Sequence, residues 1–293
     1  MIYDINHLTA YSYEAPVTAA SLALRLRPRT TLTQRSLSHE VRISPEPDHA
    51  ASHRDFYGNV VDLVSIDTPH TDLKIRSIAR VEVTARPELA GPDLAWQKVA
   101  EAALSVRDVS AAGPSHFLFS SPNIALSRDV TRYARECFTP GRGIVEGCTD
   151  LMTRIRKDFA YKPQTTQIST SIAEAFAQRA GVCQDFAQIM IGGLRGLGLP
   201  AAYVSGYLRT IPPPGKPRLQ GADATHAWVS VWAGAENGWI GFDPTNAIRA
   251  GTDHITLAIG RDFSDVSPVY GVFVGSGENE LKVEVDVIPV DAG

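Results

Sequence analysis

Residues 1–85 show the short-period alternation of apolar and polar residues that is typical of antiparallel β-structure. Turn-forming clusters such as residues 44–48 separate the runs. In residues 22–27, apolar positions alternate with Arg25 and Arg27, as in a strand with one solvent-facing side. The predicted strands cover residues 2–13, 20–27, 36–43, 59–67 and 73–84. The pattern therefore predicts a small antiparallel sandwich at the start of the chain.

The pattern changes after residues 87–92, where Pro-Glu-Leu-Ala-Gly-Pro interrupts the alternation. Helical periodicity follows as far as residue 197, and strands return after it. The predicted helices cover residues 94–106, 128–138, 144–159, 172–179 and 183–197, and the predicted later strands cover 201–208, 224–233, 238–242, 254–259 and 281–290. We therefore predict an α+β fold with an N-terminal β domain at residues 1–88 and a second domain at residues 93–293.

Composition narrows the class of protein. The chain has 293 residues, a formal net charge of −4, 44% hydrophobic residues and 20% charged residues, which is ordinary for a globular protein. No basic region favours binding to nucleic acid or to an anionic membrane. No signal-peptide pattern opens the sequence, and its three cysteines are too few for a disulfide framework. We therefore expect a cytoplasmic location.

Cys183 is the first candidate for catalysis. It follows Gly181, which permits a sharp turn, and it begins an apolar-periodic segment that predicts a buried helix. The amino end of a helix favours the thiolate form of a cysteine, and its backbone N–H groups can stabilise an oxyanion. A cysteine is more often a small buried packing residue. The assignment therefore depends on whether Cys183 has partners.

Two residues later in the chain could supply those partners. His226 begins an alternating apolar strand, and Asp243 ends a short apolar run that is followed by proline. The separation of 17 positions from His226 to Asp243 suits a β-hairpin with a loop at residues 234–238, which would bring the two side chains together. Taken singly, His226 is more often a surface residue and Asp243 a turn initiator. Together with Cys183 they supply the nucleophile, base and orienting acid of thiol catalysis.

These motifs resemble those of the bacterial transglutaminase-like proteins, often described as cysteine proteases, over nearly the whole chain. The matching segments are residues 181–187, 196–208, 225–229, 239–246, 254–268 and the N-terminal strands. The resemblance implies a papain-like core in which a nucleophile helix packs on an antiparallel sheet. It also implies acyl chemistry on an amide through a thioester, with Cys183 as nucleophile, His226 as base and Asp243 orienting the base.

The acyl acceptor and the substrate contacts are less well defined. Many transglutaminases carry Trp directly after the nucleophile, where this chain has Gln184. We therefore favour hydrolysis by a cysteine peptidase or amidase; transfer to an amine, or an inactive binding module with the same fold, are the alternatives. The expected partner is a peptide or protein amide. The predicted substrate-contacting residues are Gln184, Tyr161, Gln164, Tyr207 and Trp228.

The sequence evidence for metal ligands is weaker than that for the catalytic residues. His49 and His53 have the spacing of a zinc pair but lack the glutamate of the usual motif. Asp262 and Asp265 could bind a cation, but structural roles in turns and hydrogen bonds are favoured for them. We therefore expect neither a metal site nor a cofactor.

Overall fold

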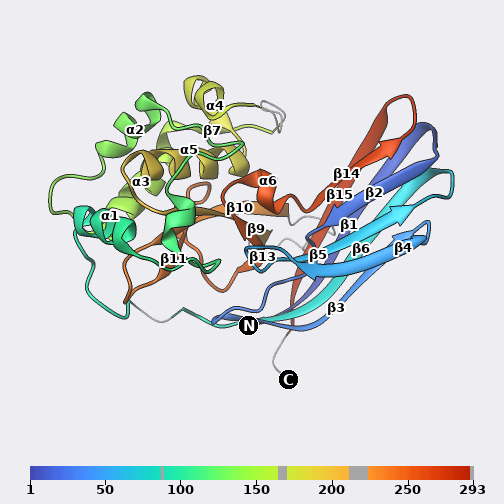
Figure 1. The fold of residues 1–293 in the computed structure, drawn as a ribbon, viewed down its shortest axis with the longest axis horizontal. Helices are drawn as coiled ribbons and strands as arrows, with labels where there is room; N and C mark the ends of the chain where they lie inside the picture. The colour runs from blue at the N-terminus through green and yellow to red at the C-terminus, as the bar shows by residue number, and fades with distance from the viewer. Residues whose placement is uncertain (87–88, 164–169, 211–223, 291–293) are drawn as a thin grey trace, which may run out of the picture.

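The computed structural model describes residues 1–86, 89–163, 170–210 and 224–290. Figure 1 shows a strand-rich region at one end of the molecule and helices around a second set of strands at the other. This arrangement confirms the predicted α+β class, with antiparallel sheets first and a helix-covered antiparallel sheet after them. In the described part of the chain, no helix is both long and apolar enough to cross a membrane.

Two four-stranded antiparallel sheets form the strand-rich region. One has the order β15-β1-β6-β3 and the other the order β14-β2-β5-β4. Leu24, Ile66 and Ile75 are among the side chains that fill the core between them. The N-terminal strands are β1 (Ile2–Val17), β2 (Ala19–Leu24), β3 (Gln34–Ser44), β4 (His49–Arg54), β5 (Val60–Ile66) and β6 (His70–Val83).

The last strands of the chain complete these two sheets. β14 (Val269–Val274) pairs with β2, and β15 (Asn279–Val290) pairs with β1 along twelve residue pairs. The expected second domain at residues 93–293 included both strands, so the structure differs from that division. The alternation within residues 279–290 identifies a strand, but it carries no information about which sheet the strand joins. The strand-rich region is therefore built from both ends of the chain.

The second region consists of helices on a five-stranded antiparallel sheet of order β12-β11-β10-β9-β13. Its helices are α1 (Trp96–Ser105), the 3-10 helix η1 (Pro114–Phe117), α2 (Arg128–Arg135), α3 (Ile144–Asp158), α4 (Ile172–Gln178), α5 (Cys183–Gly196) and α6 (Phe263–Val266). Its strands are β9 (Ala201–Leu208), β10 (Ala224–Trp232), β11 (Trp239–Asp243), β12 (Ile248–Arg249) and β13 (His254–Gly260). A short parallel pair, β7 (Ala160–Tyr161) and β8 (Ala180–Gly181), precedes α5.

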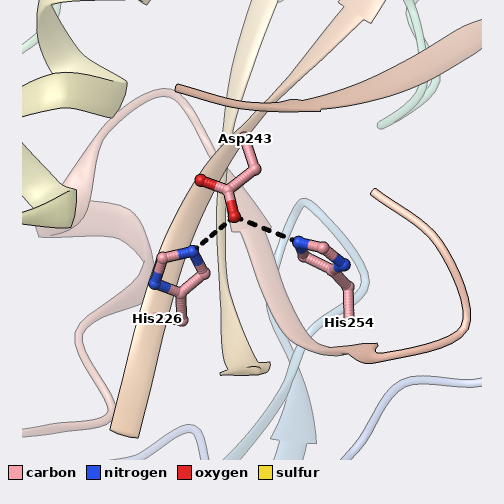
Figure 2. A group of neighbouring side chains, drawn as sticks. All are labelled: His226, Asp243 and His254. Carbon is pink, nitrogen blue, oxygen red and sulfur yellow. Dashed lines mark hydrogen bonds and ion pairs between the residues drawn. The ribbon is translucent and has the colours of Figure 1, made fainter. Parts of the chain in front are cut away.

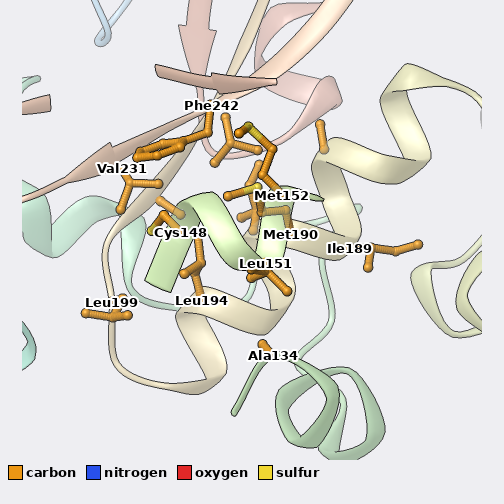
Figure 3. Close-up of a cluster of buried hydrophobic side chains, with 14 of the residues drawn as sticks. Ala134, Cys148, Leu151, Met152, Ile189, Met190, Leu194, Leu199, Val231 and Phe242 are labelled. Carbon is orange, nitrogen blue, oxygen red and sulfur yellow. The ribbon is translucent and has the colours of Figure 1, made fainter. Parts of the chain in front are cut away.

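Helix α5 lies at the centre of this region and is buried from Asp185 to Arg195. Figure 3 shows Met190 and Leu194 of α5 in the apolar cluster that also contains Val231 of β10 and Phe242 of β11. Helix α2 packs closely against the other side of α5. A Cβ atom at Gly196 would come within 2.0 Å of Thr131 Oγ1, so only glycine allows this approach. Packing on both sides along its buried length fixes the position of α5.

The two regions share a buried core. Tyr3 and Ile5 of β1 pack with Tyr207 of β9 and with Ile255 of β13. Polar contacts border this core: the Tyr3 hydroxyl donates to Asp253 at 2.8 Å. Extensive apolar burial between regions opposes their independent movement. The strand-rich region therefore has a fixed position beside the helix-covered sheet.

Candidate active site

Cys183 is the first residue of α5, and its local conformation follows from its neighbours. Val182 is extended, and its backbone N–H donates to Asp185 Oδ2 at 2.8 Å. A Cβ atom at Gly181 would lie 2.5 Å from the same oxygen, so glycine leaves room for this carboxylate. The first N–H groups of a helix have no partner within the helix. Cys183, half-buried unlike Cys137 and Cys148, therefore lies beside donors suited to a developing oxyanion.

His226 lies on β10, on the hairpin predicted from the sequence. β10 pairs with β11 from Val229↔Phe242 to Trp232↔Trp239, which brings the end of β11 beside the start of β10. His226 Nε2 lies 2.8 Å from Asp243 Oδ2. The other ring nitrogen, Nδ1, is not bonded to Asp243, and the Cys183 side chain lies close enough to His226 to raise the pKa of its ring. The ring therefore connects the thiol to the carboxylate.

Asp243 is the most enclosed residue of the group. It is fully buried, and its carboxylate has hydrogen-bonding partners on both oxygens. Oδ2 faces His226 at 2.8 Å, His254 at 3.2 Å and the Asn246 amide at 2.8 Å, while Oδ1 accepts the backbone N–H groups of Thr245 and Asn246. Burial opposes ionisation, but the hydrogen bonds from His226 and His254 outweigh it and hold the pKa of Asp243 well below its usual range. The carboxylate is therefore ionised at neutral pH.

His254 is a member of this group that sequence reasoning did not assign. Figure 2 shows the two histidine rings on either side of Asp243, each connected to the same oxygen. The Gly251 N–H donates to His254 Nδ1 at 3.3 Å, so the proton of the neutral ring is on Nε2 and points to Asp243. His254 begins β13, which is separated from β10 by β9 in the sheet. Only the order of the strands reveals this contact.

The nearby ligand atoms of His226, Asp243 and His254 lie within 4.8 Å of one another, close enough for a metal ion. All three side chains are buried, and these atoms are already joined by hydrogen bonds. We interpret the group as a hydrogen-bonded cluster because each donor and acceptor has its partner within the protein.

The charge on His226 follows from its two partners. Burial disfavours the imidazolium, but the hydrogen bonds with Asp243 and Cys183 outweigh burial and raise the pKa of His226 to about 9. A protonated ring between a sulfur atom and a carboxylate can stabilise a thiolate and later deliver a proton. The arrangement is therefore suited to nucleophilic attack by the sulfur of Cys183.

Cys183 and His226 open into a cavity of about 340 Å³. Of the predicted substrate-contacting residues, Gln184 lines this cavity. Tyr161 is 49% exposed and does not line it; burial and the nearby Cys183 raise the pKa of its hydroxyl. Gln164 lies outside the described residues. Among the described members of this set, Gln184 is therefore the one that the structure brings into the cavity wall.

Tyr207 and Trp228 are placed elsewhere. Tyr207 is fully buried between the two regions, and its hydroxyl lies 2.8 Å from His7 Nδ1. The Trp228 indole lies over Gly206, where a Cβ atom would come within 2.6 Å of the ring, and it contacts the edge of His254. Both strands are buried on two faces, so alternation alone could not show which side faces substrate. Neither aromatic residue lines the cavity.

Comparison with known families agrees with the fold. Residues 3–82 match the bacterial transglutaminase-like N-terminal region, and residues 131–244 match the transglutaminase-like superfamily. Cys183, His226 and Asp243 all lie within the second match.

Related sequences extend over almost the full chain. An uncharacterized protein of Mycobacterium tuberculosis is 39% identical over 99% of this chain and 93% of its own length. An uncharacterized protein of Mycobacterium leprae is 31% identical over 97% of both chains. A protein-glutamine gamma-glutamyltransferase of Pseudomonas aeruginosa is 38% identical, but over 30% of this chain and 13% of that protein.

A solved structure supports the same architecture. The crystal structure of a "Putative Cysteine Protease" from Cytophaga hutchinsonii superposes with a TM-score of 0.76 at 20% identity. The match covers 100% of this chain and 92% of that one. At this identity the likeness shows a shared fold.

Proposed function

This chain belongs to the transglutaminase-like superfamily, and from that membership we propose that it is a thiol enzyme that cleaves an amide through a thioester on Cys183. The observation that carries the proposal is the chain of contacts from Cys183 through His226 to the buried Asp243. A packing cysteine would need neither an imidazole partner nor a cavity. Here the thiol has both.

In the proposed reaction, the Cys183 sulfur attacks the carbonyl carbon of the amide, and the carbonyl oxygen becomes an oxyanion. The backbone N–H of Cys183 donates to that oxyanion. When the C–N bond breaks, His226 gives its proton to the leaving amine, and the acyl group remains on sulfur. Asp243 holds the ring so that Nδ1 faces the sulfur, and His254 acts as a positioning residue for Asp243.

Water is the proposed second substrate. His226, now neutral, removes a proton from water as its oxygen attacks the thioester, and the products are a carboxylic acid and the free thiol. Gln184 in the cavity wall supports this step, because an aromatic side chain there would shield the thioester more fully from water. The partial likeness to the Pseudomonas aeruginosa gamma-glutamyltransferase favours the second candidate, transfer of the acyl group to an amine.

A direct competition between water and an amine tests the acceptor. We expect incubation with a glutamine-containing protein and a labelled primary amine to form free acid faster than it incorporates label. The Cys183→Ala variant supplies the background for both measurements. Incorporation of label that requires Cys183 and exceeds formation of acid would replace hydrolysis by transamidation.

The raised pKa of His226 predicts the alkaline limit of activity. Because the imidazolium protonates the leaving amine, kcat/KM should fall as the pH rises through about 9. The folded pKa lies above the ordinary 6.5, so the charged ring contributes stability below pH 6.5, and this contribution is lost as the pH approaches 9. Measuring kcat/KM and the free energy of unfolding from about pH 5 to 10 checks the expected fall in activity and the expected loss of stability. A decline in kcat/KM centred near pH 6.5 would contradict the raised pKa of His226.

A further inference from the structure

One face of β1 serves both the interface between the regions and the cavity. Its inward residues alternate, and the first of them pack against the helix-covered sheet. Farther along the same face, His7, Thr9 and Tyr11 line the cavity that contains Cys183. The strand-rich region therefore supplies a wall of the candidate active site.

The adjacent strand β15 extends this wall with apolar side chains. Val283 pairs with Thr9 and Leu281 pairs with Tyr11, so each pair lies on the same face of the sheet. Val283 is 46% exposed and Leu281 is 53% exposed, and both line the cavity. Covering such apolar surface is favourable by about 25 cal/mol per Å². The wall is thus suited to an apolar group beside the nucleophile.

Apart from the reactive pair Cys183 and His226, the cavity is poor in charge. Among the described residues that line it, none is Asp, Glu, Lys or Arg. His7 is buried, and its ring nitrogens lie 2.8 Å from the Tyr207 hydroxyl and 3.1 Å from Thr9 Oγ1. Burial lowers the pKa of His7 to about 4, so the ring is neutral at pH 7. The residues of this wall offer no ionic partner to a charged group, which would lose water there at a cost.

We propose that the wall formed by Thr9, Leu281 and Val283 binds an uncharged, apolar side chain of the substrate, next to the amide that Cys183 attacks. This inference rests on the proposed function, and it gives the strand-rich region a role in specificity. The cavity volume of about 340 Å³ is near the lower end of the range for small-ligand sites, ~300–1,000 Å³. A short apolar segment of a peptide is therefore the expected occupant.

Alkylation of Cys183 tests the wall without a known substrate. The reagents are iodoacetamide, iodoacetanilide, which adds a phenyl ring, and 4-carboxy-iodoacetanilide, which adds a charge to that ring. Each rate at Cys183, measured by peptide mass spectrometry, is divided by the rate of the same reagent with glutathione. We expect the phenyl ring to raise this normalised rate by about tenfold and the carboxylate to remove most of the gain.

The variant Val283→Lys should abolish the phenyl preference and accelerate the carboxylate reagent relative to iodoacetamide. Leu281→Lys provides a second variant at an exposed position of the wall. Val272→Lys is the matched control, since Val272 is 67% exposed on β14 and does not line the cavity. Circular dichroism checks that each variant is folded.

The outcomes separate this inference from the proposed function. No phenyl preference in the unmodified protein, or a preference that survives both lysine variants, would overturn the apolar site, even if Cys183 reacts much faster than glutathione. Slow alkylation by every reagent would instead count against the reactive nucleophile. A phenyl preference that depends on Val283 would support the apolar binding site whether Cys183 reacts fast or slowly, because the ratios are independent of the absolute reactivity.

Discussion

Replacing Cys183 with alanine is expected to lower kcat/KM by about 10⁵- to 10⁶-fold, the scale typical of the loss of a catalytic nucleophile. The variant keeps the helix but has no atom that can form the thioester. Cys183→Ser should also lose most activity, because a hydroxyl is far harder to deprotonate than a thiol. Both values are obtained from initial rates of amide cleavage with the purified variants.

The fold should survive this change. Cys183 is half-buried, and the substitution removes a single sulfur atom without opening a large cavity in the core. Cys137→Ala is the matched control, since Cys137 is buried in the helix-side core away from the cavity. It should keep kcat/KM within about twofold while losing some stability. A Cys183→Ala protein with near-normal turnover would refute the assignment of the nucleophile.

Asp243→Asn is expected to lower kcat/KM by about 10⁴-fold, by comparison with the same change in serine protease triads. The amide nitrogen would occupy the position of one carboxylate oxygen and face N–H donors. If it replaces Oδ2, it faces His226, His254 and Asn246, and the His226 ring loses the partner that sets its orientation. The free energy of unfolding should also fall by about 3–5 kcal/mol, because a buried charged network loses its centre.

The control for Asp243→Asn must separate stability from catalysis. Asp262 is also a fully buried carboxylate, and it accepts hydrogen bonds from Ser264 and from the Asn123 backbone. Asp262→Asn should lower the midpoint of urea unfolding while folded protein keeps its kcat/KM. If Asp243→Asn retained kcat/KM within about tenfold of the original enzyme, Asp243 would be a structural residue only.

Local features of the sequence predicted much of this arrangement. The hairpin between His226 and Asp243 is formed by strands that are neighbours in the chain, so alternation and a glycine-containing loop suffice to place both residues. Gly181, two residues before Cys183, indicated the start of α5 because glycine permits the sharp turn before the helix. Such contacts depend on short stretches of sequence, and the predicted helix and strand positions are largely confirmed.

Contacts between distant segments could not be predicted in the same way. His254 reaches Asp243 only because β13 lies at the edge of the sheet beside β9. Val283 faces the cavity because β15 pairs with β1. Strand β4 was missed for another reason: His49–Arg54 is an exposed edge strand without the apolar alternation that marks half-buried strands. Sheet order therefore accounts for the unpredicted part of the site.

The pairing of β1 with β15 also has a consequence for biosynthesis. Residues 2–13 leave the ribosome before their hydrogen-bonding partners at residues 279–290, which are made after the rest of the second region. Contacts of such wide sequence separation form slowly, because the intervening chain must be ordered first. The nascent chain therefore contains Cys183 before it has a complete wall beside that thiol. Apolar substrate recognition would begin only when synthesis of β15 is finished.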